Sequence, residues 1–212
     1  MQFLTVSDEV VPTVYSLSAR ERFAAVECVL ACGDLPFYYL EFLVTTLGVP
    51  CLYVQGNHDK PEVSEREQII APRGCISVDR RSHAHAGILI AGLGGCLRYN
   101  RDSGAQYTET EQMLRLLALA PRLFFNRLRH GRYVDIFLTH APPRGIHDGH
   151  DRPHHGFRAF HTVLQRFQPR YLIHGHIHHT YGYNRGIETQ SGATTILNTV
   201  GYRLLNYTAG ER

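Results

Sequence analysis

The sequence lacks the features of a membrane protein and of a nucleic-acid-binding protein. It has no stretch that approaches the roughly 18 consecutive apolar residues of a membrane span, and no run of five or more basic residues. Its first residues, MQFLTVSDE, contain no basic segment followed by a long apolar one, and they resemble a strand that starts at once. We therefore expect no membrane contact, no nucleic-acid footprint and no secretory leader.

The sequence also lacks a CxxC pair and an even number of cysteines. Its five cysteines are Cys28, Cys32, Cys51, Cys75 and Cys96, and several of them lie in apolar runs. A free cysteine in such a run behaves as a small hydrophobic residue. We therefore expect a reducing compartment, and we predict a cytoplasmic protein.

The composition predicts one packed domain over residues 1–212. The hydrophobic fraction of 43% excludes a disordered chain, and 212 residues are enough for one α/β domain with a large core. No internal repeat, low-complexity tract or linker interrupts the sequence. The net charge of +3 says little about partners, whereas 14 histidines are unusual for this length.

Short apolar runs of strand length alternate with helical patterns along the chain. Apolar residues at successive positions are expected for strands that are buried on both faces. The runs cover Phe3–Ser7, Glu27–Cys32, Pro50–Gln55, Gly87–Leu93, Tyr133–Thr139, Arg170–His174, Thr194–Asn198 and Tyr202–Tyr207. The helical patterns cover Leu35–Leu47, Glu109–Arg129 with an interruption at Pro121, and Phe157–Phe167. Thr108 and Glu111 form a capping box before the second helix. The early strands are typical of βαβ units, and the last two, which Gly201 separates, are typical of a hairpin.

Five of these runs are followed by residues that can bind a metal ion. In chain order they are Asp8, Asp34, Asn57 with His58 and Asp59, His140, and His176 with His178. In open α/β sheets, sites form beyond the carboxyl ends of the strands, so we expect these residues to converge. Carboxylate, amide and imidazole ligands without thiolate suit Mn²⁺, Fe, Zn²⁺ or Mg²⁺.

Each of these residues has an ordinary explanation when it is taken alone. An aspartate after a strand is usually a helix cap or turn residue, and Asn57 after glycine is typical of a turn. His140 before Ala-Pro-Pro is typical of a surface loop. The alternate histidines of Gly-His-Ile-His are more specific, because side chains two residues apart at a strand end point the same way. The five blocks in this order favour a metal site.

In this respect the sequence resembles the calcineurin-like metallophosphoesterase superfamily, whose ordered blocks are D-x-H, G-D, G-N-H-[DE], a lone H and G-H-x-H. The matching residues cover nearly the whole chain, and four of the five blocks are intact. They are Ser7-Asp8-Glu9-Val10, Gly33-Asp34, Gly56-Asn57-His58-Asp59, Thr139-His140 and Gly175-His176-Ile177-His178. The resemblance implies a four-layer αββα sandwich of two mixed β-sheets flanked by helices, with two divalent metal ions.

The resemblance also implies a role for each residue. Asp34 bridges the two ions, Asp8 and His178 bind one of them, and Asn57, His140 and His176 bind the other. His58 binds no metal and acts on the substrate. We expect Asp59, which lies beside His58, to be the carboxylate that orients the histidines.

The first block departs from the family pattern because Val10 stands where the family has a histidine. Valine cannot coordinate a metal, so the ion at Asp8 keeps fewer ligands and is expected to bind weakly. Glu9 could replace the histidine, although strand alternation points it the other way. A water, or a residue of the His-rich segment 147–155, could also fill the gap.

The predicted chemistry is hydrolysis of a small phosphate-ester substrate. Two cations about 3.5–4 Å apart clamp a phosphoryl group and generate a metal-bound hydroxide that attacks phosphorus. Arg98 and His155 are candidate substrate-binding residues, although a surface arginine and a solvated loop are the simpler explanations. A dense arginine cluster would favour dianionic monoesters, and with only Arg98, Arg144 and Arg152 near the site the sequence favours phosphodiesters.

Three alternatives stay open at this point: a phosphomonoesterase, a single-metal enzyme with altered chemistry, and a non-catalytic protein-binding scaffold with the same fold. His58 argues against the scaffold, because a scaffold does not need an imidazole that is directed at a substrate. Val10 argues for it.

Overall fold

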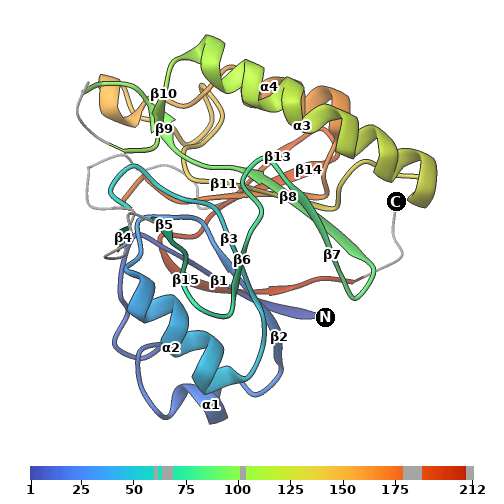
Figure 1. Ribbon diagram of the computed structural model, residues 1–212. Helices are drawn as coiled ribbons and strands as arrows, with labels where there is room; N and C mark the ends of the chain where they lie inside the picture. Colours follow the sequence, from blue (N-terminus) through green and yellow to red (C-terminus); the bar gives the residue numbers. More distant parts are fainter. Residues whose placement is uncertain (60–61, 64–68, 101–103, 179–187, 209–212) are drawn as a thin grey trace.

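Two β-sheets lie face to face at the centre of the molecule, and helices cover the outer face of each (Figure 1). This computed structural model describes residues 1–59, 62–63, 69–100, 104–178 and 188–208. The expected four-layer αββα sandwich of two mixed sheets is confirmed.

The first sheet has the strand order β15-β1-β2-β3-β6. Its strands are β1 (Gln2–Ser7), β2 (Val26–Ala31), β3 (Cys51–Tyr53), β6 (Cys75–Ser77) and β15 (Gly201–Asn206). Strands β1, β2, β3 and β6 are parallel, and β15 joins β1 in the antiparallel direction. The carboxyl ends of β1, β2 and β3 therefore lie at the same edge of the sheet.

The second sheet has the strand order β13-β14-β12-β11-β8-β7. Its strands are β7 (Ser82–His85), β8 (Ile88–Leu93), β11 (Ile136–Thr139), β12 (Tyr171–His174), β13 (Glu188–Ser191) and β14 (Thr194–Asn198). The four central strands are parallel, and β7 and β13 add antiparallel edges. Here too the carboxyl ends of the central strands share one edge.

The apolar runs of the sequence are continuous because each sheet is covered on both faces. Phe3 packs between the two sheets, whereas its neighbour Leu4 packs on the outer face under the helices. In the second sheet, Ile136 and Leu138 face the first sheet and Phe137 faces the helices. Successive side chains of a strand point to opposite faces, so burial of both faces requires apolar residues at successive positions.

The helices pack on the outer faces through apolar side chains. Helices α1 (Ala19–Arg22) and α2 (Phe37–Leu47) cover the first sheet. Helices α3 (Glu109–His130) and α4 (Ala159–Thr162) cover the second, and a π-helical turn, Val163–Phe167, extends α4. The capping box predicted at Thr108 and Glu111 is present at the start of α3.

Shorter elements complete the described fold. They are β4 (Glu62–Val63), β5 (Ile69–Ile70), β9 (Cys96–Leu97), β10 (Gln106–Tyr107) and a 3₁₀ turn, Arg152–His154. Strands β4 and β5 pair with each other, as do β9 and β10. The 3₁₀ turn lies within the His-rich segment 147–155.

Two sequence predictions about the fold are wrong. The last two predicted strands do not form a hairpin, because β14 belongs to the second sheet and β15 to the first. Helix α3 also continues through Pro121. Pro121 has no backbone N–H to donate to the carbonyl of Leu117, four residues before it. Both residues are exposed, so water can bind that carbonyl instead.

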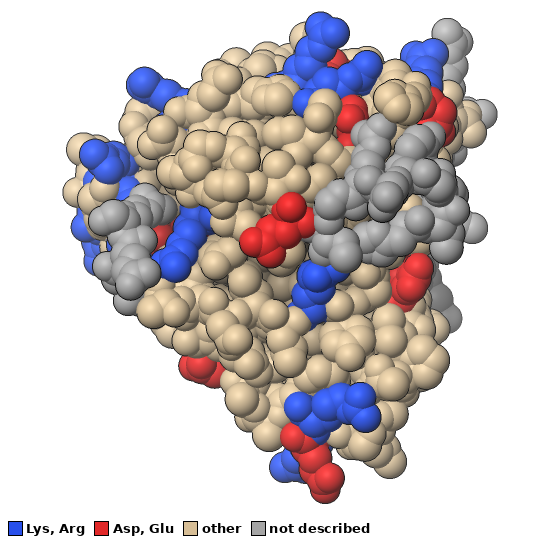
Figure 2. All heavy atoms as spheres, turned by 180° about the vertical axis from the view of Figure 1, so that it is seen from behind, with Lys and Arg blue, Asp and Glu red and all other residues tan. Residues whose placement is uncertain are grey.

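No helix among the described residues is both long enough and apolar enough to cross a membrane. Figure 2 shows the molecule from behind relative to Figure 1, and on this face the basic and acidic side chains lie in small separate groups.

Candidate metal centre

The predicted ligands come together where the two sheets present the carboxyl ends of their parallel strands. Asp8, Asp34 and Asn57 follow β1, β2 and β3 of the first sheet, and His140 and His176 follow β11 and β12 of the second. The two groups face each other across the space between the sheets. A hydrogen bond of 2.9 Å from the backbone amide of His176 to Oδ2 of Asp8 joins the two sheets directly.

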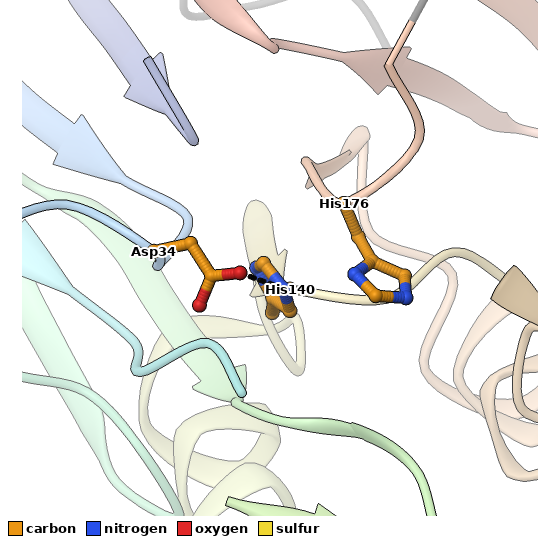
Figure 3. A group of neighbouring side chains, drawn as sticks. All are labelled: Asp34, His140 and His176. Carbon is orange, nitrogen blue, oxygen red and sulfur yellow. Dashed lines mark ion pairs between the residues drawn. The ribbon is translucent and has the colours of Figure 1, made fainter. Parts of the chain in front are cut away.

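Asp34, His140 and His176 form the centre of this group (Figure 3). One potential ligand atom from each lies within 4.8 Å of the others. Nε2 of His140 is 3.3 Å from Oδ2 of Asp34, and the rings of His140 and His176 have their centroids 4.8 Å apart. Both histidines are buried. The carboxylate of Asp34 points toward the ring of His140, and the ring of His176 lies nearby.

Asn57 adds an amide oxygen to the same group. Its Oδ1 is 3.0 Å from Nε2 of His140, and its amide nitrogen donates to the hydroxyl of Tyr99 at 3.3 Å. Because Tyr99 holds the nitrogen, the oxygen of this buried amide faces His140. These two contacts therefore turn the amide oxygen of Asn57 toward the other candidate ligands.

Asp8 and His178 form the second half of the group. Oδ2 of Asp8 accepts hydrogen bonds from the backbone amide of His176 and from the hydroxyl of Ser7. Oδ1 of Asp8 is 3.7 Å from Nε2 of His178. The side chain of Asp8 is only 3% exposed, whereas that of His178 is 28% exposed.

Three of these residues have a left-handed backbone, which is uncommon outside glycine. The φ angle is +64° at Asp8, +57° at Asp34 and +68° at His176. At Asp8 and His176 the chain also makes a three-residue turn, closed by amide-to-carbonyl bonds from Glu9 to Ser7 (2.7 Å) and from Ile177 to Gly175 (2.8 Å). Such conformations cluster at functional sites, where the surrounding structure holds them.

Three glycines next to the ligands allow these turns to pack closely. A Cβ atom on Gly175 would overlap Ser7 Oγ and Asp8 Oδ2, and one on Gly56 would overlap Asp34 Oδ1. A Cβ atom on Gly33 would overlap the backbone of Gly56. The glycine that begins each of these three blocks is therefore required, because a neighbouring ligand loop lies too close for a side chain.

Main-chain carbonyls orient the two buried histidines. Nδ1 of His140 is 2.8 Å from the carbonyl of Cys32, which leaves Nε2 directed at Asp34 and Asn57. Nε2 of His176 is 2.8 Å from the carbonyl of Pro153 in the His-rich segment, which leaves Nδ1 for the centre. These partners carry no signal in the sequence, because every residue type offers the same carbonyl.

Asp59 has a different position from the one predicted for it. Its carboxylate accepts hydrogen bonds from the backbone amides of Gly56 (2.8 Å), Leu35 (3.0 Å) and Asp34 (3.1 Å). The expectation that it orients the histidines is corrected, because carbonyls orient His140 and His176 and Asp59 binds the backbone. Asp59 holds the Asp34 turn and the Asn57 turn together, so it positions two ligand loops.

His58 lies at the rim of the group. Its backbone amide donates a hydrogen bond of 2.7 Å to Oδ1 of Asp34, while its side chain is exposed. The backbone of His58 thus binds a candidate ligand, and its imidazole remains accessible to a substrate.

The other two predicted site residues lie outside this group. The guanidinium of Arg98 bonds to Glu111 (2.9 Å) and to the carbonyl of Gln106 (3.1 Å), so it ties β9 to β10 and to the start of α3. His155 lines a cavity of about 690 Å³ together with Arg144, His147, His150 and Thr189. A substrate-binding role for Arg98 or His155 stays a prediction.

The buried charges of the group depend on one another. Burial alone would lower the pKa of His140, but the carboxylates of Asp34 and Asp8 and the Cys32 carbonyl raise it to about 9. Burial would likewise raise the pKa of Asp34, but His140 and the His58 amide hold it well below its usual value. Burial and the nearby His140 charge lower the pKa of His176 to about 3. Burial raises the pKa of Asp8.

The donor set fits divalent metal ions. Two ligand atoms that bind the same ion at about 2.0–2.2 Å can be at most about 4.4 Å apart. The atoms of Asp34, His140 and His176 approach this limit, and the 3.7 Å between Asp8 and His178 lies inside it. Oxygen and imidazole nitrogen donors without thiolate suit hard or borderline cations. A cation would also replace the positive charge that His140 carries when protonated.

A buried Asp, Asn and His group at the strand ends of an αββα sandwich defines a candidate metal-dependent hydrolase. The family model for calcineurin-like phosphoesterases matches residues 29–180, and the chain belongs to this family, which uses divalent metal ions. The matched range begins after Asp8 and Val10, so the block that departs from the family pattern lies outside it.

Solved structures resemble the fold at low sequence identity. The phosphopantetheinyl hydrolase PptH from Mycobacterium tuberculosis is 12% identical, with a TM-score of 0.57 over 94% of this chain and 89% of that chain. A single mutant of Vps29 from Entamoeba histolytica is 14% identical, with a TM-score of 0.45 over 98% of this chain and 86% of that chain. No curated protein matches the sequence.

Proposed function

We propose that this protein hydrolyses phosphate esters, phosphodiesters in particular, with two divalent metal ions at the strand ends. The observation that carries the proposal is the convergence of Asp34, His140 and His176 within 4.8 Å of one another, from strand ends of two sheets. Family membership supports the same reaction class.

The residues would divide between two ions as follows. Asn57, His140 and His176 would hold one ion, Asp8 and His178 the other, and Asp34 both. Bound ions of this kind neutralise a phosphoryl group and lower the pKa of water toward neutrality. We propose Mn²⁺, Fe, Zn²⁺ or Mg²⁺, because the donors are oxygen and imidazole nitrogen.

His58 would act on the substrate. Its exposed imidazole lies one residue from Asn57, and its backbone is fixed by the 2.7 Å bond to Asp34. A side chain in this position can protonate the leaving oxygen as the ester bond breaks. A non-catalytic scaffold has no need of such a group.

Two of the arginines that could bind a substrate phosphate are already paired with carboxylates, which favours a monoanionic substrate. Arg98 pairs with Glu111 at 2.9 Å, and Arg144 lies 3.6 Å from Asp148. Arginines that are already paired with carboxylates provide less positive charge for a dianionic monoester. We therefore favour phosphodiesters.

The cavity beside the His-rich segment is a candidate site for the rest of the substrate. Its walls include His155 and Arg144. The same segment reaches the metal centre through the Pro153 carbonyl, and the ring of His154 lies 5.4 Å from that of His176. A substrate that binds at the centre could therefore extend toward this cavity.

We further propose that the protein works in the cytoplasm, because all five cysteines are free thiols and four of them are buried. Free thiols are typical of reducing compartments.

The test is turnover of matched aryl phosphodiester and phosphomonoester substrates by protein that has been stripped of metal and then reloaded. We expect no turnover after chelation, recovery with Mn²⁺ or a similar ion, and a higher kcat/KM for the diester. Full turnover after chelation would refute a metal-dependent reaction. A much higher kcat/KM for the monoester would make the protein a phosphomonoesterase, and metal binding without turnover of either ester would favour the scaffold.

A further inference from the structure

Val10 cannot supply the ligand that the family pattern has at position 10, because a valine side chain has no donor atom. Val10 is partly buried and packs against the apolar layer between the first sheet and helices α1 and α2. Its side chain therefore lies against the core. The candidate ion at Asp8 and His178 thus lacks one side-chain ligand of the family pattern.

Glu9 lies on the side of the site, contrary to the expectation from strand alternation. Oε1 of Glu9 is 3.2 Å from Nδ1 of His178. The reason is the left-handed turn at Asp8, with φ of +64° and a bond from the Glu9 amide to the Ser7 carbonyl. This turn ends the pleat of β1, so the alternation of side chains no longer applies to Glu9.

The two ring nitrogens of His178 face two different carboxylates. Nδ1 faces Glu9 at 3.2 Å, and Nε2 faces Oδ1 of Asp8 at 3.7 Å. A carboxylate at Nδ1 favours the tautomer with the proton on Nδ1 and leaves the Nε2 lone pair for a metal. The Asp8 oxygen on the Nε2 side is Oδ1, whereas Ser7 and the His176 amide bind Oδ2.

We propose that Glu9 is a positioning residue that prepares His178 to bind the second metal ion and compensates for Val10. The inference rests on the proposed function, because it concerns the same metal centre. Glu9 acts through His178 and not as a ligand, since its carboxylate contacts the ring nitrogen on the far side from Asp8. Residues of this kind typically change metal affinity by about 10- to 100-fold. Glu9 is 53% exposed, so we expect an effect of about tenfold, at the lower end of that range.

The first test compares metal binding by wild type, Glu9→Ala, Glu9→Gln and a control, Glu21→Gln. Glu21 is an exposed glutamate on α1, so the control makes the same charge change away from the site. Metal-free protein is titrated with Mn²⁺, and the bound ions are counted by elemental analysis. We expect Glu9→Ala to weaken only the weaker of two binding steps, about tenfold. Glu9→Gln keeps a hydrogen-bond acceptor and should have a smaller effect, and the control should bind as wild type does.

A double-mutant cycle separates a positioning residue from a ligand. If Glu9 acts through His178, Glu9→Ala should have no further effect on the weaker step in a His178→Ala background. An equal effect in both backgrounds would overturn the inference, because Glu9 would then act on the ion independently of His178. Unchanged affinity in Glu9→Ala would also overturn it. If wild type bound no metal at all, the proposed function would fail instead, so the two failures are distinguishable.

Discussion

The backbone amide of His176 donates a hydrogen bond of 2.9 Å to Oδ2 of Asp8. The two residues are 168 positions apart in the chain and follow strands of different sheets. Each has a left-handed backbone, and a glycine without Cβ, Gly175, allows the two turns to meet. The metal centre is therefore assembled by the packing of one sheet against the other, and changes at this contact should affect both structure and metal binding.

Gly175→Ala should destabilise the protein and weaken metal binding together. The new Cβ would overlap Ser7 Oγ and Asp8 Oδ2, so the two turns must separate. Overpacking of this kind costs about 1–3 kcal/mol. The measurements are thermal unfolding and Mn²⁺ titration. Gly104→Ala is the control, because its nearest neighbour would lie at 3.5 Å, an ordinary contact. Equal stability and affinity of the two variants would mean that the close approach at Gly175 is unimportant.

Asp34→Asn should reduce metal content more than any other single ligand change. Asp34 is the residue that both proposed ions share, and its carboxylate also bonds to His140 and to the His58 amide. We expect fewer than one bound ion per chain by elemental analysis and loss of metal-dependent turnover. Asp79→Asn, at a carboxylate paired with Arg115 instead, is the control. Two retained ions in Asp34→Asn would exclude the bridging role.

The affinity of the metal-free protein for Mn²⁺ should rise with pH. Burial would lower the pKa of His140, but the carboxylates of Asp34 and Asp8 raise it to about 9. Below that pH a proton therefore occupies Nε2, the nitrogen that faces Asp34. A metal must displace this proton, whereas the pKa of His176, about 3, leaves that histidine neutral. The apparent affinity should therefore rise by up to about tenfold per pH unit toward pH 9.

The check is titration with Mn²⁺ between about pH 6.5 and about pH 8.5, with proton release measured by calorimetry in buffers of different ionisation enthalpy. We expect close to one proton released for the tighter ion. An affinity that does not change over this range would show that His140 is already neutral in the metal-free protein.

His58→Ala should lower kcat without changing metal content. General acid catalysis contributes about 10²- to 10⁴-fold, and the exposed imidazole is the group that we assign to it. The decrease should be smaller for nitrophenyl esters, whose leaving groups hardly need a proton. The measurement is kcat for wild type and variant on good and poor leaving groups, with metal content determined in both. Loss of metal would make His58 a ligand, and full activity with full metal content would remove it from the mechanism.

The chain itself indicates the αββα fold and the convergence of the candidate ligands. Apolar residues at successive positions require sheets that are covered on both faces, as Phe3 and Leu4 are. Parallel strands end at a common edge, so polar residues after each strand must meet there, as Asp34 and His140 do. Local patterns were reliable where the interaction is local, as in the Thr108 capping box.

Other features depend on contacts that no local pattern encodes. The strand Gly201–Asn206 resembled the second half of a hairpin, but it pairs with β1 because the first sheet has a free edge there. The carbonyls of Cys32 and Pro153 orient the buried histidines, and main-chain groups carry no residue-type signal. Glu9 reaches His178 because packing against Gly175 holds Asp8 in a left-handed turn. Residue types thus determined which atoms can bind a metal, whereas the packing of the two sheets decided how those atoms are oriented, since orientation depends on neighbours distant in the sequence.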